Sequence, residues 1–239
     1  MPASGNWPPE AELDFSDVVR KRRMVRNYGP DPVPAEAIDR IINAARKAPS
    51  AGFSQGVSFI VVTNEGTRRQ IGDLAGESGY VAAGFDPWIS RAPTHIVVAV
   101  SELAYHERYQ EADKLQPDGS EIEWPIPYWW VDAGAALMLV LLAAVNEGLA
   151  AGFLGVHSTP GLRELLEIPA AVTPLGVVTV GYPLPDRRSG SLERGWKPPE
   201  KVLHFEKWQP ASGPITGQPT HPGGVTNSGA GLPASRSDA

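Results

Sequence analysis

The stretch of residues 131–147 constrains the fold most, because it is apolar around almost its whole circumference. Its sequence, VDAGAALMLVLLAAVNE, is rich in Ala, Leu and Met, which favour a helix over a strand. Asp132 stands where a helix N-terminus favours an acid, and Gly148 follows as a C-terminal stop. The uncharged part, 133–145, is shorter than the roughly 20 apolar residues that a membrane span needs. We therefore expect the helix to be covered either by a sheet of its own chain or by a second copy of the chain.

Short helices and short buried strands alternate on both sides of this stretch. Apolar runs predict strands at residues 57–63, 94–100 and 174–182, and a short strand or turn at residues 151–156. Apolar stripes and capping residues predict helices at residues 35–47, 67–74 and 160–167, the last one capped by Thr159, and a shorter helix that starts near Phe15. Residues 76–93 are expected to be irregular, and residues 201–205 could add an edge strand. This order indicates an α+β or α/β fold in which the apolar helix packs on the sheet.

Residues 101–130 combine six aromatic residues with charges and prolines, and no period assigns them to a helix or a strand. A connection of this length is often a lid or a binding loop. The other interpretation is an irregular packing segment that happens to be aromatic. The sequence favours neither.

Composition excludes several classes of function. The chain of 239 residues has a net charge of −6 and a pI of about 5.4, which argues against general nucleic-acid binding. It has no cysteine, which excludes disulfides, thiolate zinc sites, iron–sulfur clusters and a cysteine nucleophile. The histidines lack metal-ligand spacing, so we predict no metal site and a structural role for each. Motifs for a Rossmann dinucleotide site, a P-loop, a zinc protease or a nucleophile elbow are absent.

The two ends of the chain differ in composition from its middle. The first residues, MPASGNWPPEAELD, lack a basic-then-apolar signal pattern, so we expect a cytoplasmic protein that does not associate with membranes. Residues 1–13 are predicted to form a loose arm and residues 14–208 a single domain. Residues 209–239 are rich in Pro, Gly, Ser and Thr, and are predicted to be disordered.

A basic run, RKRRMVR at residues 20–26, follows the first short helix. Five of its seven residues are Lys or Arg in an otherwise acidic chain. One interpretation is a solvated helix end whose cations complement the helix dipole. The other is an anion site, because the fork of an arginine matches two phosphate oxygens at once.

The segment APSAGFSQG at residues 48–56 joins a predicted helix to a predicted strand. Its small residues let a ligand approach backbone N–H groups, and Ser50, Ser54 and Gln55 can form hydrogen bonds with it. The alternative is an ordinary helix-to-strand connection.

Taken together, five stretches resemble the FMN-dependent nitroreductase family. RRMVRNY resembles the family's N-terminal RRSxRxF phosphate motif, and APSAGFSQG resembles its PSxxNxQPW loop. The apolar helix with the following EGLAAGFLGVHSTPGLRELLEIP is similar to the family's long central helix and flavin-contacting turn. TPLGVVTVGYP and SLERGWKPPEKVLHFEKW resemble its last core strand and its C-terminal basic segment. The resemblance covers roughly residues 14–208, with the motifs in the family's order.

The resemblance implies an α+β fold whose central, mostly antiparallel sheet is flanked by helices. The long apolar helix would lie at a homodimer interface, and FMN would be bound there by both chains. NADH or NADPH would be the electron donor. The loop departs from the family pattern in two places: Phe53 replaces the frequent asparagine, and Gly56-Val57 replaces Pro-Trp. These replacements are expected to change substrate preference more than flavin binding.

The family's motifs also imply which residues would contact the cofactor. In the basic run, the residues that would contact the FMN phosphate and ribityl oxygens are Arg22, Arg23, Arg26 and the backbone of Met24. Met24 replaces the family's frequent serine. In the loop 48–56, the partner subunit's residues that would border the isoalloxazine are Pro49, Ser50 and Ala51. Further polar contacts with the cofactor would come from Ser54 and Gln55. The backbone of Leu154 and Gly155 would face the flavin, and Arg194 and Lys197 would reach back to the phosphate.

The implied activity is reduction of a nitroaromatic, quinone or similar small aromatic acceptor by NAD(P)H through FMN, with ping-pong kinetics. No side chain is nominated as a catalytic acid or base. Alternatives within the same fold are a flavin destructase that makes dimethylbenzimidazole, a halotyrosine dehalogenase and a deazaflavin-binding protein. A protein that stores or senses FMN also stays open, whereas the acidity of the chain disfavours nucleic-acid binding through the basic run.

Overall fold

The computed structural model describes residues 14–187 and 189–208, which fall into two compact units that divide at residue 189. The predicted arm 1–13 and the predicted tail 209–239 lie outside the described residues. The predicted domain 14–208 therefore covers both units. The second unit contains the 3₁₀ turns η3 (Gly190–Arg194) and η4 (Pro199–Lys201), so the edge strand considered for residues 201–205 is wrong.

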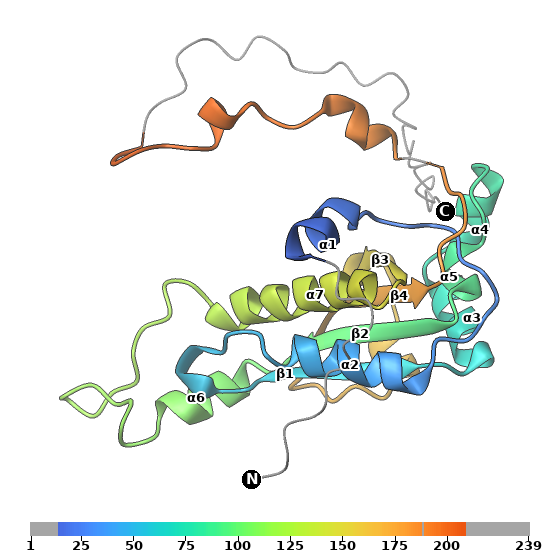
Figure 1. Cartoon of the computed structure of the whole chain (residues 1–239). Coiled ribbons are helices and arrows are strands. Elements are labelled where there is room, and N and C mark those ends of the chain that lie inside the picture. The colour runs from blue at the N-terminus through green and yellow to red at the C-terminus, as the bar shows by residue number, and fades with distance from the viewer. Residues whose placement is uncertain (1–13, 188, 209–239) are drawn as a thin grey trace, which may run out of the picture. The chain divides into compact units, whose positions relative to one another are not determined.

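The first unit is built on one antiparallel sheet of four strands, in the order β1-β2-β4-β3 (Figure 1). The strands are β1 (Val57–Val62), β2 (Thr94–Val100), β3 (Ala150–Gly155) and β4 (Thr173–Gly181). β1, β2 and β4 were predicted as strands and β3 as a short strand or turn, and five of the eight predicted ends differ from the observed ones by one residue. Every residue of β2 is buried, because this strand lies between two others and has both faces covered.

Eight helices and two short turns connect and cover the described part of this sheet. They are α1 (Phe15–Lys21), α2 (Ala35–Ala45), η1 (Ala51–Phe53), α3 (Glu65–Leu74), α4 (Glu77–Ala82), α5 (Trp88–Arg91), α6 (Leu103–Tyr109), α7 (Tyr128–Asn146), η2 (Val156–Ser158) and α8 (Leu162–Leu165).

The two faces of the sheet carry separate cores. On one face α2 and α7 pack over Ile96 and Val98 of β2 and over their neighbours in β4. On the other face α3, α5 and α8 pack over Val97 and Val177. The side chains of a strand point alternately to its two faces, so the continuous apolar run of β2 supplies both cores.

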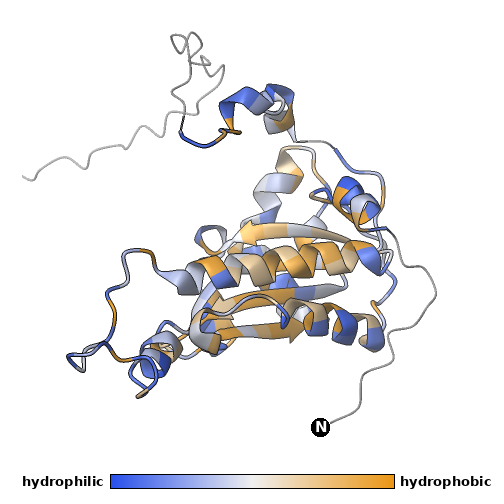
Figure 2. Ribbon diagram, turned by 60° about the vertical axis from the view of Figure 1, so that its left-hand side comes forward, coloured by the Kyte–Doolittle hydropathy of each residue, from blue (hydrophilic) through white to orange (hydrophobic). Residues whose placement is uncertain are grey.

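The apolar helix α7 packs on the sheet of its own chain, which is the first of the two kinds of cover that the sequence allowed. It contacts α2 and all four strands (Figures 1 and 2). By length and composition alone it could cross a membrane, but eight of its residues are buried within the protein, as in a core helix. One side of α7 remains exposed, with Val131 50% and Met138 46% accessible.

The N-terminus of α7 differs from the prediction. The helix begins at Tyr128, after Pro127, because Trp129 is buried in a third small core that extends the helix toward its start. Asp132 therefore lies within the helix and is only 3% exposed, rather than standing at a solvated N-terminus. The C-terminal stop is confirmed, since Gly148 adopts the left-handed conformation with φ of 71°.

Two other segments also depart from the sequence-based expectation. The predicted helix 160–167 shortens to α8, because Gly161, with φ of 85°, starts it, and Thr159 closes the turn η2 instead of capping a helix. Residues 76–93 contain the short helices α4 and α5, which the sequence did not reveal.

Candidate functional site

The basic run continues from α1 as an extended segment that lies beside β3. Met24 forms a parallel bridge with Ala151, and the backbone N–H of Val25 donates to the carbonyl oxygen of Ala151 at 3.1 Å. A Cβ atom at Gly152 would lie 2.6 Å from the carbonyl oxygen of Val25. Only glycine therefore allows the segment to approach the strand this closely.

A buried carboxylate holds this segment from the other side. Oδ2 of Asp186 accepts a hydrogen bond from the backbone N–H of Arg26 at 2.9 Å, and its Oδ1 forms an ion pair with the guanidinium of Arg23. The side chain of Asp186 is only 4% exposed. The positive charge of Arg23, predicted as a cofactor contact, is thus already compensated within the chain.

Three other cations of the run are not compensated. Lys21, Arg22 and Arg26 form no ion pair with any residue that the structure describes. The guanidinium carbon of Arg26 lies 5.7 Å from the centroid of the Trp88 ring, which orients this side chain without neutralising it. Three unpaired cations on a fixed segment favour the binding of an anion such as a phosphate group.

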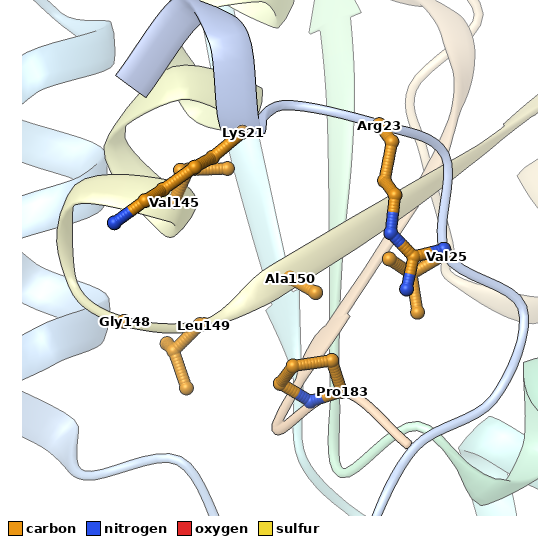
Figure 3. A pocket seen from close by; sticks show the side chains of 8 residues that line it. All are labelled: Lys21, Arg23, Val25, Val145, Gly148, Leu149, Ala150 and Pro183. Carbon is orange, nitrogen blue, oxygen red and sulfur yellow. The ribbon is translucent and has the colours of Figure 1, made fainter. Parts of the chain in front are cut away.

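A pocket of about 270 Å³ opens beside this segment (Figure 3). Figure 3 shows Lys21 at the end of α1 and Arg23 on the segment that follows it, both near the first residues of β3. The residues that line the pocket are Lys21, Arg23, Val25, Val145, Gly148, Leu149, Ala150 and Pro183. Pockets that hold an entire cofactor usually start at about 300 Å³. The single chain therefore offers room for part of such a ligand, next to positive charge.

The predicted loop 48–56 has a strained backbone. Gly52, Phe53 and Gln55 all have positive φ, of 60°, 59° and 53°. For Phe53 and Gln55 this conformation is unfavourable, because their Cβ atoms crowd the backbone. Such strain persists only where the surroundings impose it, and it is often found at functional sites.

The polar residues predicted in this loop mostly bond to the loop itself. The hydroxyl of Ser50 accepts the backbone N–H of Gln55 at 2.8 Å, and the hydroxyl of Ser54 donates to the carbonyl oxygen of Ala51 at 2.7 Å. Pro49 and Gln55 are exposed. The two serines therefore shape the loop, while Gln55 is available to a ligand.

The basic segment and the loop lie at opposite ends of α7. The backbone N–H of Ala51 donates to Asp132 near the start of the helix, whereas the pocket beside the basic segment is lined by Val145 near its end. Thirteen residues of helix separate these two positions, which corresponds to about 20 Å. One chain does not bring the two halves of the predicted site together.

The remaining predicted residues lie elsewhere. The side chain of Leu154 is buried in the core of the sheet, so only its backbone is available to a ligand, and Gly155 is half-buried at the end of β3. Arg194 and Lys197 are exposed and belong to the second unit, Arg194 as the last residue of η3.

His95 lies inside the sheet, in agreement with the structural role expected for it. It is fully buried in β2, and its Nε2 lies 2.7 Å from the carbonyl oxygen of Ile89. Burial lowers its pKa from 6.5 to about 4. The ring is therefore neutral near neutral pH and donates from Nε2.

Comparison with known proteins decides the family. The model of the nitroreductase family matches residues 19–182, more than two thirds of the chain. The chain belongs to the nitroreductase family. The matched residues include the basic segment, the loop, α7 and all four strands.

Individual relatives agree with this assignment. One relative is a putative NADH dehydrogenase/NAD(P)H nitroreductase of Methanothermobacter thermautotrophicus, to which the chain is 30% identical over 203 residues. The match covers 83% of this chain and 90% of the relative. It is 31% identical over 188 residues, 78% of its length and 71% of the relative's, to a Bacillus subtilis protein named FMN reductase (NAD(P)H). Proteins named iodotyrosine deiodinase match at lower identity, 26% over 216 residues for that of Nematostella vectensis. The protein is thus an oxidoreductase enzyme.

A solved structure supports the fold. The hypothetical oxidoreductase YcnD from Bacillus subtilis superposes with a TM-score of 0.65 and 27% identity, over 82% of this chain and 75% of that chain. The α+β nitroreductase-like fold predicted from the sequence is confirmed.

Proposed function

We propose that this protein is a cytoplasmic, homodimeric FMN-dependent oxidoreductase that uses NADH or NADPH to reduce nitroaromatic, quinone or related aromatic acceptors. The observation that carries the proposal is a set of three cations, at the end of α1 and on the segment beside β3, that have no ion-pair partner among the described residues: Lys21, Arg22 and Arg26. The names of the relatives, NAD(P)H nitroreductase and FMN reductase, support the choice of cofactor and donor.

The residues present fit a flavin mononucleotide. Arg22 and Arg26 would hold its phosphate, with Lys21 adding positive charge, while Asp186 keeps the backbone of the segment in place. The exposed side chain of Gln55 and the backbone at Gly155 would contact the ring or the ribityl chain. FMN, when bound, supplies the hydride transfer between nicotinamide and acceptor. The protein's residues bind and orient it.

The exposed side of α7 supports the proposal of a homodimer. The exposed Val131 and Met138 and the half-buried Leu142 lie on one side of the helix, at spacings of seven and four residues. Met138 lies near the midpoint between Asp132 and Val145. If two copies of α7 pack antiparallel about a two-fold axis at Met138, the loop of each chain meets the basic segment of the other. The predicted site would then be complete only in the dimer.

Ping-pong kinetics follow from a single shared site. The oxidised nicotinamide must leave before an aromatic acceptor can occupy the same position. Initial rates measured at several fixed acceptor concentrations should give parallel double-reciprocal lines. Intersecting lines would contradict the shared site.

The proposal is tested by the absorption spectrum of the purified protein, before and after anaerobic addition of NADH or NADPH. A protein-bound flavin absorbs near about 370 and about 450 nm, as expected of the cofactor itself. Bleaching of the longer-wavelength band on addition of either nucleotide would support the reductase. A colourless protein that FMN does not reconstitute would refute it.

A dehalogenase remains the second candidate, because proteins named iodotyrosine deiodinase match the chain. The flavin destructase and deazaflavin alternatives rest on the sequence resemblance alone. Halide release from a halotyrosine by the reduced protein, at rates above those for nitroaromatic acceptors, would favour the dehalogenase.

A further inference from the structure

We propose that Asp132 is a positioning residue, whose carboxylate holds the loop 48–56 in the strained conformation that borders the cofactor of the partner subunit. The inference rests on the proposed function for the identity of that cofactor. Its evidence is a set of contacts between α7, α6 and the loop, none of which involves the basic segment.

One oxygen of Asp132 accepts two hydrogen bonds. Its Oδ2 lies 2.8 Å from the backbone nitrogen of Ala51 and 2.8 Å from the hydroxyl oxygen of Tyr105. Both side chains are buried, Asp132 to 3% and Tyr105 to 0% exposure. Burying a carboxylate is costly, and these two hydrogen bonds to Oδ2 offset part of that cost.

Tyr105 links this carboxylate to the rest of the loop. Burial, followed by the hydrogen bond to Asp132, raises the pKa of Tyr105 above its usual value, so its hydroxyl stays protonated and donates. Its ring also packs against the loop, because a Cβ atom at Gly56 would lie 2.6 Å from it. Within the loop, the hydroxyl of Ser50 accepts the N–H of Gln55 at 2.8 Å. Asp132 thus fixes Ala51 at the start of the strained turn, and Tyr105 joins the same carboxylate to the end of the loop.

Two glycines allow α6 to pack directly on the loop backbone. A Cβ atom at Gly52 would lie 2.5 Å from the ring of Tyr109, and one at Gly56 would lie 2.6 Å from the ring of Tyr105. In addition, Nε of Arg108 donates to the carbonyl oxygen of Gly52 at 2.9 Å. Side chains of α6 and the carboxylate of Asp132 therefore both hold the backbone of the loop.

Aromatic residues of segment 101–130 pack against the tyrosines of α6 that contact the loop. The ring of Trp124 packs edge-on against those of Tyr105 and Tyr109, and its Nε1 donates to Glu121 at 2.6 Å. Nδ1 of His106 lies 2.7 Å from the same carboxylate oxygen. The aromatic part of the segment therefore packs behind α6 and the loop, whereas almost all of residues 110–120 are exposed.

The contacts that hold the loop also explain the conformation of Phe53 at its tip. Phe53 has a positive φ and is 73% exposed, so no contact of its own side chain within the described chain explains its conformation. The backbone on either side of it is fixed by Asp132, Arg108 and Ser50. The contacts therefore present the Phe53 ring outward, in the direction from which a second copy of the chain or a ligand can reach it.

The first test compares Asp132→Ala with wild type and with the matched control Asp118→Asn. Asp118 is an exposed acid of segment 101–130, and among the described residues its side chain accepts hydrogen bonds from Ser120. We expect Asp132→Ala to raise the Kd for FMN by at least about tenfold, the loss expected for one charge-assisted hydrogen bond. We expect it to raise the KM for an aromatic acceptor more than it lowers kcat, and the control to change neither. Unchanged Kd and KM in a folded, dimeric Asp132→Ala protein would overturn the proposal.

Two milder variants keep the proposal testable if Asp132→Ala does not fold. Tyr105→Phe removes one hydroxyl and keeps the ring, and Asp132→Asn keeps one acceptor for the N–H of Ala51. Both should shift the Kd for FMN in the same direction by less than Asp132→Ala, because each keeps part of the network. Wild-type affinity in both variants would contradict the positioning role.

Hydrogen exchange separates this inference from the proposed function. In the flavin-free protein, the amides of residues 51–55 should exchange faster in Tyr105→Phe and Asp132→Asn than in wild type. If wild type binds no FMN and this loss of protection is still seen, the support of the loop stands and the cofactor assignment fails. Equal protection in wild type and variants would refute the support itself.

Discussion

Oδ2 of Asp186 lies 2.9 Å from the backbone nitrogen of Arg26, although 160 residues separate the two in sequence. This hydrogen bond ties the basic segment to the chain that follows β4 and leaves the guanidinium of Arg26 unpaired. Within the described residues, the Asp186 carboxylate thus bonds to Arg23 and to the backbone of the segment rather than to the guanidinium of Arg26.

Removing this acid should destabilise the fold. We expect Asp186→Ala to lower the free energy of unfolding by about 1–3 kcal/mol, because the N–H of Arg26 loses its acceptor. The ion pair with Arg23 adds little, since that arginine is half-exposed. Urea denaturation measures the change. Asp86→Ala is the matched control, because Asp86 pairs with Arg91 at the surface; an equal loss in both variants would contradict the role of the buried bond.

The unpaired arginines should carry the affinity for FMN. The double variant Arg22→Ala, Arg26→Ala should remain a folded dimer and raise the Kd for FMN at least about 100-fold, the loss expected for two charge-assisted hydrogen bonds. Flavin fluorescence titration measures this Kd. Arg20→Ala is the control, because Arg20 is exposed and already paired with Asp17. Stoichiometric flavin in the purified double variant would refute the phosphate assignment.

The exposed side of α7 should form the dimer interface. Met138→Asp should yield a folded monomer in sedimentation, because a charge would then be buried between two apolar helices. Met138→Leu keeps the apolar contact and should remain dimeric. Leu141→Asp is no substitute for this test, since Leu141 is 4% exposed within its own chain and the charge would disrupt its core. A dimer that persists in Met138→Asp would show that another surface is used.

His95 should make stability depend on pH. Its pKa of about 4 lies below the value of 6.5 for the unfolded chain, so the unfolded state binds more protons between these two values. Its contribution, about 3 kcal/mol, is present above pH 6.5 and lost as the pH falls toward 4. Urea denaturation at pH 7.5 and 4.5 should show a smaller difference for His95→Gln than for wild type. The same difference in both proteins would contradict the assignment.

Local signals were sufficient to predict much of the fold. The strands β2 and β4 and the helices α2 and α7 follow from apolar runs and stripes that each element carries within itself. The start of α7 was wrong because it depends on the burial of Trp129 in a core built with Tyr105, a contact that no local period reveals. The length of α8 was overestimated, because Gly161 rather than Thr159 precedes its first residue.

The candidate site could be predicted only in part. The basic run and the small-residue loop stand out in the sequence, and their proposed contacts with a cofactor stay predictions. The roles of Asp132 and Asp186 were missed, because each depends on a partner far away along the chain. An isolated acid carries no signal of its own until the fold places a donor beside it.

The placement of the basic segment and the loop at opposite ends of α7 has a genetic consequence. A chain with Arg22→Ala and Arg26→Ala keeps a sound loop, and a chain with Asp132→Asn keeps sound arginines. If each site combines one end from each subunit, a mixed dimer of the two chains contains one undamaged site and one doubly damaged site. Random mixing makes half of the dimers mixed, so about a quarter of all sites should regain wild-type affinity. Two defective alleles would then complement each other, as sites held within single chains would not.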